Sequence, residues 1–173
     1  FYCEDSPAFK NFSIEMGELT VVTGIPNHGK SSFLNWMLMN LIRRYSDLFG
    51  EKKRSEEVRV GIFSPESMPP AAYIAKSVGQ FANKPFEKQY SNRISKDELL
   101  DHSAFLNKYL YLLNPSLDSL DPEKILSMAR ALVLTRGVNV ICLDPLNKFD
   151  HCNTDMGMSD NDYMAWFFNK WKF

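Results

Sequence analysis

Short apolar runs rich in β-branched residues alternate along the chain with longer segments of helical apolar spacing. The runs predict buried strands, because a strand covered on both faces is apolar at nearly every position. Strands are expected at residues 19–23, 58–63, 109–113 and 138–143, and helices at residues 30–48, 71–82, 95–108, 122–136 and 162–173. This alternation predicts an α/β fold in three layers, with a mostly parallel sheet covered by helices on both faces. No internal linker interrupts the pattern, so residues 1–173 are interpreted as a single domain.

Two of the expected helices carry clear end signals. Ser95 followed by Glu98 has the spacing of a capping box, in which each residue satisfies a backbone N–H of the other. Asp121 before Pro122 predicts a helix start, and Gly137 predicts the stop of the same helix. Residues 86–94 and 150–160 give no clear indication of secondary structure.

Composition and charge exclude some classes of protein but do not indicate a function. Apolar residues make up 45% of the chain and the net charge is -1, so there is no bulk positive field for nucleic acid, and any basic groove has to be local. The odd count of 3 cysteines argues against a disulfide framework, and Cys142, inside an apolar run, is expected to be a small buried hydrophobe. With no signal peptide and no apolar stretch of bilayer length, we expect an intracellular, cytoplasmic protein without a membrane partner.

The strongest motif is a glycine-rich loop between the first expected strand and the first expected helix. It matches the Walker A pattern G-x-x-x-x-G-K-[ST], whose glycines let backbone N–H groups converge on phosphate oxygens. The helix that starts at Lys30 points its positive end at the same anion, Lys30 reaches the β- and γ-phosphates, and the Ser31 hydroxyl ligates Mg²⁺. The expected nucleotide-binding residues are Gly24, Ile25, Pro26, Asn27, His28, Gly29, Lys30, Ser31 and Ser32.

Chance is the competing explanation for the loop. Given average glycine usage, a random match in a chain of this length has a probability of about one per cent or less. The expected strand before the loop and helix after it reduce this further, so the motif indicates binding of ATP or another nucleoside triphosphate. His28 is interpreted as a tolerated loop residue rather than a specific ligand.

Two carboxylates follow expected strands and complete the candidate site. Asp144 stands directly after residues 138–143, the Walker B position for an acid that holds Mg²⁺, although a turn cap before Pro145 would use the same residue. Glu66 lies just beyond residues 58–63 and could orient and deprotonate an attacking water. An exposed loop glutamate is the alternative for Glu66. Because ligands bind at the carboxyl ends of strands in such sheets, Lys30, Glu66 and Asp144 are expected to face one phosphate.

Three segments resemble one family. Residues 17–31 are similar to the nucleotide-binding segment of RecA-type ring helicases, in particular DnaB-like and Twinkle-like replicative helicases, including phage and organellar primase–helicases. Residues 63–66 resemble the family segment that carries the catalytic glutamate, and residues 144–151 resemble its Walker B segment. The segments come in family order, and the combination is more specific than the Walker loop alone.

The resemblance implies a RecA-like core that uses ATP or another nucleoside triphosphate with Mg²⁺. It also implies a homo-oligomeric ring with sites between subunits, 5′–3′ movement along single-stranded DNA, and Glu66 as general base. No segment of this chain matches the family's sensor strand, DNA-binding loops or arginine finger, so a C-terminally shortened or partial domain with slow hydrolysis is expected. Two other functions stay open: a non-motor RecA-like regulatory or recombination module, and a small-molecule P-loop kinase, for which no arginine-rich lid is visible.

The last expected helix carries aromatic residues at helical spacing. Such residues can stack on single-stranded bases, but an apolar face packed on the core explains the same spacing and is preferred. The residues are Tyr163, Trp166, Phe167 and Trp171.

Overall fold

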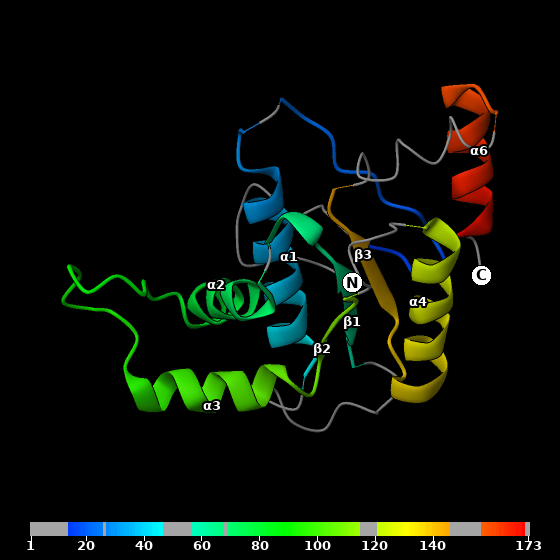
Figure 1. Ribbon diagram of the computed structural model, residues 1–173. Coiled ribbons are helices and arrows are strands. Elements are labelled where there is room, and N and C mark those ends of the chain that lie inside the picture. Colours follow the sequence, from blue (N-terminus) through cyan, green and yellow to red (C-terminus); the bar gives the residue numbers. More distant parts are fainter. Residues whose placement is uncertain are drawn as a thin grey trace.

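A parallel sheet lies at the centre of the protein. The computed structural model describes residues 14–25, 27–46, 57–67, 69–114, 121–145 and 157–171. Its strands are β1 (Val60–Phe63), β2 (Leu110–Leu112) and β3 (Val140–Leu143), which pair in parallel in the order β2-β1-β3 (Figure 1). The expected α/β fold with a parallel sheet is therefore confirmed, and it is consistent with a RecA-like core.

Helices cover both faces of this sheet. α1, α2 and α3 lie on one side, and α4 and α6 lie on the other, which makes three layers (Figure 1). The α2–α3 pair projects from the body, and the connection between these helices forms its far end (Figure 1). The helices are α1 (Lys30–Arg44), α2 (Pro70–Ala82), α3 (Lys96–Leu106), α4 (Pro122–Arg136) and α6 (Asp160–Lys170), with a short 3-10 helix η4 (Pro65–Ser67) after β1.

Side chains alternate across the sheet with the period of two that a strand imposes. Val60 and Ile62 of β1 join the core beneath α1 and α2, whereas Phe63 joins the core beneath α4 and α6. β3 divides in the same way, with Cys142 on the first side and Leu143 on the second. Both faces are apolar, and this explains why the strands read as continuous apolar runs.

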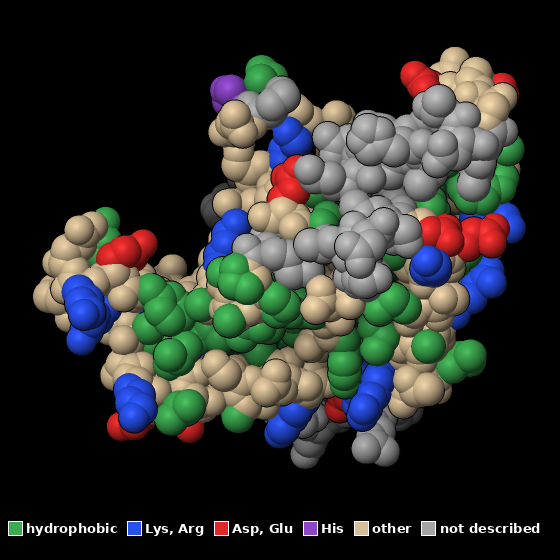
Figure 2. All heavy atoms as spheres, viewed as in Figure 1, with side chains coloured by type: hydrophobic (Ala, Val, Ile, Leu, Met, Phe, Trp, Pro, Cys, Tyr) green, Lys and Arg blue, Asp and Glu red, His purple; other side chains and the backbone are tan. Residues whose placement is uncertain are grey.

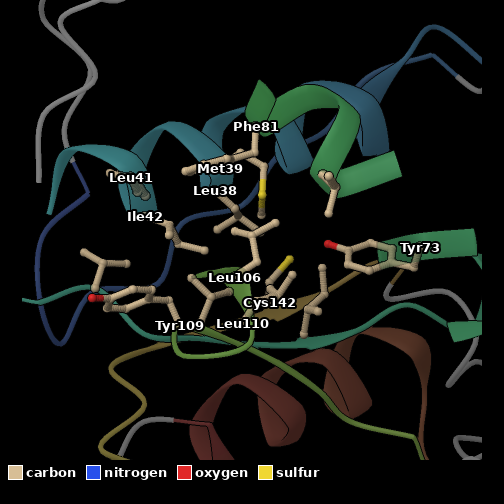
Figure 3. Packing of buried hydrophobic residues seen from close by; sticks show 14 of the residues in the cluster. Leu38, Met39, Leu41, Ile42, Tyr73, Phe81, Leu106, Tyr109, Leu110 and Cys142 are labelled. Carbon is tan, nitrogen blue, oxygen red and sulfur yellow. The ribbon is translucent and has the colours of Figure 1, made fainter. Parts of the chain in front are cut away.

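The first core, which we call the site-side core, combines α1, α2 and α3 with one sheet face (Figure 3). It contains Leu38, Ile42 and Val78, all 1% exposed or less. The second, which we call the far-side core, is built mainly from aromatic and aliphatic residues of α4 and α6, including Tyr163 and Phe167. The aromatic spacing of the last helix is therefore explained by packing, as preferred from the sequence.

The capping signals are confirmed. Glu98 N donates to Ser95 Oγ at 3.2 Å and Ser95 N donates to Glu98 Oε2 at 2.9 Å, which completes the capping box of α3. Glu123 N donates to Asp121 Oδ1 at 2.9 Å at the start of α4, and Gly137 ends that helix with φ 66°.

Three helix ends differ from expectation, and one of them is the end of α3, which stops at Leu106 rather than at Lys108. α6 starts at Asp160 rather than at Asp162, because the Ser159 hydroxyl accepts from Asp162 N at 3.3 Å and so caps the helix earlier. α1 ends at Arg44, where Tyr45 leaves the helical conformation, rather than near residue 48. Residues 47 and 48 lie outside the described part of the chain, as do residues 172 and 173 of the last expected helix.

The strand expected at residues 19–23 is wrong. This segment has no strand structure and lies outside the sheet, with Leu19 50% exposed and Val21 62% exposed. A strand exists only where its backbone groups pair with a neighbouring segment. β-branched composition alone therefore did not decide the structure of this run.

Two further expectations concern cysteine chemistry and the membrane. Cys142 is a free thiol and only 7% exposed, as expected for a small buried hydrophobe. Among the helices that the structure describes, none is long and apolar enough to cross a bilayer.

Candidate functional site

Both predicted carboxylates leave the sheet at the same end. β1 and β3 are parallel neighbours with Phe63 opposite Leu143, and Asp144 N donates to Phe63 O at 2.9 Å. Asp144 is half-buried directly after β3, while Glu66 is exposed in η4, just after β1. The carboxyl ends of two paired strands thus place Glu66 and Asp144 at one edge of the sheet, as the sequence predicted.

The Walker loop reaches this edge through α1. Asn27 and Gly29 adopt positive φ values of 62° and 80°, and Gly29 is the N-cap from which α1 begins at Lys30. No acidic residue stands in the first turn of α1, so the positive end of the helix is left for an external anion. The loop residues Ile25, Asn27 and His28 are exposed, and Pro26 lies outside the described residues.

Lys30 folds back across its own loop. Its Nζ donates to Gly24 O at 3.0 Å and to Ile25 O at 2.9 Å. These carbonyls hold the ammonium group over the loop, where backbone N–H groups and the helix end also concentrate positive charge. A phosphate group in the loop would compete for the same ammonium hydrogens.

Ser31 meets Asp144, although 113 positions separate them in the chain. The Ser31 hydroxyl donates to Asp144 Oδ1 at 3.0 Å, which joins the first turn of α1 to the end of β3. A hydroxyl and a carboxylate are hard oxygen ligands, and Mg²⁺ typically takes one or two protein oxygens and completes its shell with water and phosphate. The donor set fits Mg²⁺ on these grounds. Within the described residues no group of three His, Cys, Asp or Glu forms a further metal site.

Ser32 contributes its backbone rather than its side chain to the surroundings of the loop. Its carbonyl oxygen accepts from Gln80 Nε2 of α2 at 3.2 Å. The predicted nucleotide residue therefore also ties α1 to the helix that follows Glu66.

Sequence reasoning missed the polar residues that lie beneath this site. Asn35 is 2% exposed and accepts from the Tyr73 hydroxyl at 2.6 Å and from the Ser77 hydroxyl at 3.2 Å. Burial raises the pKa of Tyr73, and the nearby Cys142 and Asp144 raise it further. The available signal was the pair of asparagines, Asn35 and Asn40, among the apolar residues of α1.

Comparison with known proteins adds one similarity. The chain is 31% identical over 166 residues to the Twinkle homolog protein, chloroplastic/mitochondrial, of Arabidopsis thaliana. The match covers 93% of this chain but 22% of that relative, so the chain spans about a fifth of its length. No protein-family profile matches, and no solved structure matches. Over most of its own length, the chain is therefore similar to a Twinkle-type protein, in agreement with the helicase-family resemblance of residues 17–31, 63–66 and 144–151.

Proposed function

We propose that this chain is the nucleotide-hydrolysing motor core of a Twinkle-type DNA helicase. The observation that carries the proposal is the 3.0 Å contact between Ser31 Oγ and Asp144 Oδ1. It brings the Walker loop to the carboxyl end of β3, beside the strand that leads to Glu66. The similarity to the Arabidopsis Twinkle homolog supports the same function.

ATP binding follows from the loop. Backbone N–H groups of residues 27–31 and the N-terminus of α1 would hold the β- and γ-phosphates, with Lys30 exchanging its two carbonyl partners for phosphate oxygens. Ser31 and Asp144 would hold Mg²⁺, which supplies compensation for the negative charge on the phosphates.

Hydrolysis needs a group that positions water and accepts its proton. Glu66 is the candidate, because it is exposed at the carboxyl end of the sheet, in η4 just after β1, and β1 is the neighbour of the strand that precedes Asp144. A Glu66 carboxylate oxygen would take the proton as the water oxygen attacks the γ-phosphorus and the bond to the β–γ bridging oxygen breaks. The products are ADP and inorganic phosphate.

Movement on single-stranded DNA, its 5′–3′ direction and assembly into a homo-oligomeric ring are further parts of the proposal. On the face drawn in Figure 2, cationic and anionic side chains of the described residues are interspersed and do not form one basic stripe. With a net charge of -1, a positive DNA path would have to be a local groove, built by the fold or by assembly of several subunits.

The test is ATP hydrolysis with Mg²⁺, with and without single-stranded DNA, together with nucleotide binding. Lys30→Ala should weaken nucleotide binding. Glu66→Gln should bind ATP like the wild type and lose about 10²–10⁴-fold in turnover, which is the typical contribution of a general base. DNA should raise the wild-type rate.

The outcomes of this test distinguish the proposed motor from the other candidate functions. Unchanged binding by Lys30→Ala would refute the nucleotide site, and full turnover by Glu66→Gln would refute the assigned base. If single-stranded DNA changes neither the rate of ATP hydrolysis nor the affinity for nucleotide, a non-motor nucleotide-binding module would be favoured. Transfer of the γ-phosphate to an added small molecule would instead indicate a kinase.

A further inference from the structure

A polar network is buried between α1 and α2, inside the otherwise apolar site-side core. Asn35 of α1 is 2% exposed, and on α2 Tyr73 is 5% exposed and Ser77 is completely buried. The Tyr73 and Ser77 hydroxyls both donate to Asn35 Oδ1, while Asn35 Nδ2 donates to Gln80 Oε1. Gln80 in turn donates to the backbone carbonyl of Ser32 at 3.2 Å.

Burial of these groups has a cost that only good pairing offsets. An unpaired amide or hydroxyl in an apolar core costs about 1–3 kcal/mol. Here both ends of the Asn35 amide have partners, and the Ser77 hydroxyl lies close to a second acceptor, Tyr73 O, at 2.9 Å. Apolar side chains would hold the two helices together without this cost, so the network points to a requirement for position rather than for stability.

The network lies between the parts of the proposed catalytic site. Asn35 stands one helical turn after Ser31, and Gln80 contacts Ser32. On one side, the network is therefore anchored on α1, the helix that starts at the Walker loop. On the other side, the network is anchored on α2, the helix that follows η4 and its Glu66 in the chain. In Figure 3 the Tyr73 hydroxyl points into the cluster that also holds Cys142, two positions before Asp144 on β3.

We propose that Asn35, Tyr73 and Gln80 are positioning residues that fix α2, and with it Glu66, relative to the phosphate loop. Apolar contacts are non-directional and let packed helices shift, whereas three convergent hydrogen bonds on one amide define a single register. A displacement of about 1 Å at a reacting group can cost on the order of 10²-fold in rate. The inference deepens the proposed function and rests on it, because it concerns the geometry of the same hydrolysis.

The test uses Tyr73→Phe and Asn35→Leu, with Asn40→Leu as the matched control. Tyr73→Phe removes one hydroxyl and keeps the ring, so it is the mild variant. Asn40 is a second buried asparagine of α1, 8% exposed, but its amide donates to Trp36 O of the same helix at 3.1 Å. It therefore matches Asn35 in type, helix and burial without contacting α2 through that bond.

Turnover at saturating Mg-ATP should fall by roughly tenfold in Tyr73→Phe and more in Asn35→Leu, while nucleotide affinity stays within about twofold. Asn40→Leu should leave both quantities near wild type. The double variant of Asn35 and Tyr73 should fall no further than Asn35→Leu alone, because the residues act as one unit. A loss of affinity equal to the loss of turnover, or equal effects from Asn40→Leu, would overturn the inference.

A second readout does not depend on turnover. Mg-ATP should protect the backbone amides of Ser64, Glu66 and Ser67 from hydrogen exchange in the wild type, and Tyr73→Phe should remove most of that protection. Protection that survives in Tyr73→Phe and Asn35→Leu would refute the positioning role even if the chain does not hydrolyse ATP. A wild type without turnover, or Lys30→Ala that binds normally, would instead count against the proposed function.

Discussion

The two faces of the sheet are covered by different kinds of packing. On the site side, α1 and α2 enclose aliphatic and aromatic residues together with the buried Asn35–Tyr73–Ser77 network. On the far side, α4 and α6 pack Phe63, Tyr163, Phe167 and their neighbours, with ring centroids of Phe167 and Trp171 5.7 Å apart. Charged contacts there stay at the surface, as in the 3.1 Å pair between Lys170 and Glu123.

This difference follows from what each face supports. The site side carries α1 and the helix that follows Glu66, and the proposed hydrolysis would require their relative position to be held to within about 1 Å. The far side only needs to bury the back of β1 and β3, and large apolar side chains do so without directional bonds. Directional polar packing therefore lies next to the candidate site, and the cluster of α4 and α6 on the other face is packed mainly by apolar side chains.

The largest expected effect is a loss of stability when the far-side core is disrupted. Phe167→Ala should lower the free energy of unfolding by about 3–5 kcal/mol, because it removes a ring that is 2% exposed in an aromatic cluster. Nucleotide affinity of the folded fraction should not change, since α6 packs on the face of the sheet opposite α1. Urea denaturation and nucleotide titration measure the two quantities. Leu134→Ala, at an 85% exposed position of α4, is the control and should stay within about 0.5 kcal/mol.

The next effect falls on the site alone. Asp144→Asn should weaken binding of Mg-ATP by roughly 10–100-fold, corresponding to about 1.5–3 kcal/mol for an interaction with a charged group. Binding of ATP without Mg²⁺ should change little, because the loop and Lys30 remain. Titrations with and without Mg²⁺ give the comparison. Equal losses in both conditions would mean that Asp144 supports the fold rather than the metal.

A smaller effect is expected when the cap of α4 is removed and the far-side core is left intact. Asp121→Ala removes the side chain that accepts from Glu123 N at 2.9 Å and should cost about 1 kcal/mol of stability. Ser127→Ala on the same helix is the control, because its hydroxyl bonds to Lys124 O within α4. Thermal melts should give a lower melting temperature for Asp121→Ala than for Ser127→Ala. A cap variant as stable as the control would show that α4 is held by its buried face alone.

The smallest effect tests the projecting α2–α3 pair. A hydrogen bond from Lys84, with further bonds from Ser95, lowers the pKa of Glu98 from 4.5 to about 2. A depressed carboxyl pKa contributes stability that is fully present above about pH 4.5 and is lost as the pH falls towards 2. Because Glu98 is exposed, the contribution should be slight. Wild type should exceed Glu98→Gln in denaturation midpoint at pH 7 and approach it near pH 2, whereas a constant difference would contradict the pairing.

Local signals predicted local structure well. Asp121, Pro122 and Gly137 mark the ends of α4 because caps act between residues only a few positions apart. The placement of Asp144 and Glu66 also followed from the sequence, since Asp144 comes directly after one strand, Glu66 comes shortly after its neighbour, and parallel strands end at one edge. The contact of Ser31 with Asp144 agrees with the Walker A and Walker B assignments, while their roles in catalysis stay predictions.

The sequence by itself therefore determined the order of the helices, three of the four expected strands, the capped starts of α3 and α4, and the positions of Asp144 and Glu66 after their strands. Only the tertiary structure decided that residues 19–23 lie outside the sheet and that Asn35 joins Tyr73 and Gln80. The physical reason is the same in both cases. Strand pairing and buried hydrogen bonds depend on a partner distant in the chain, whereas a cap or an apolar period depends on the neighbours that the sequence itself supplies.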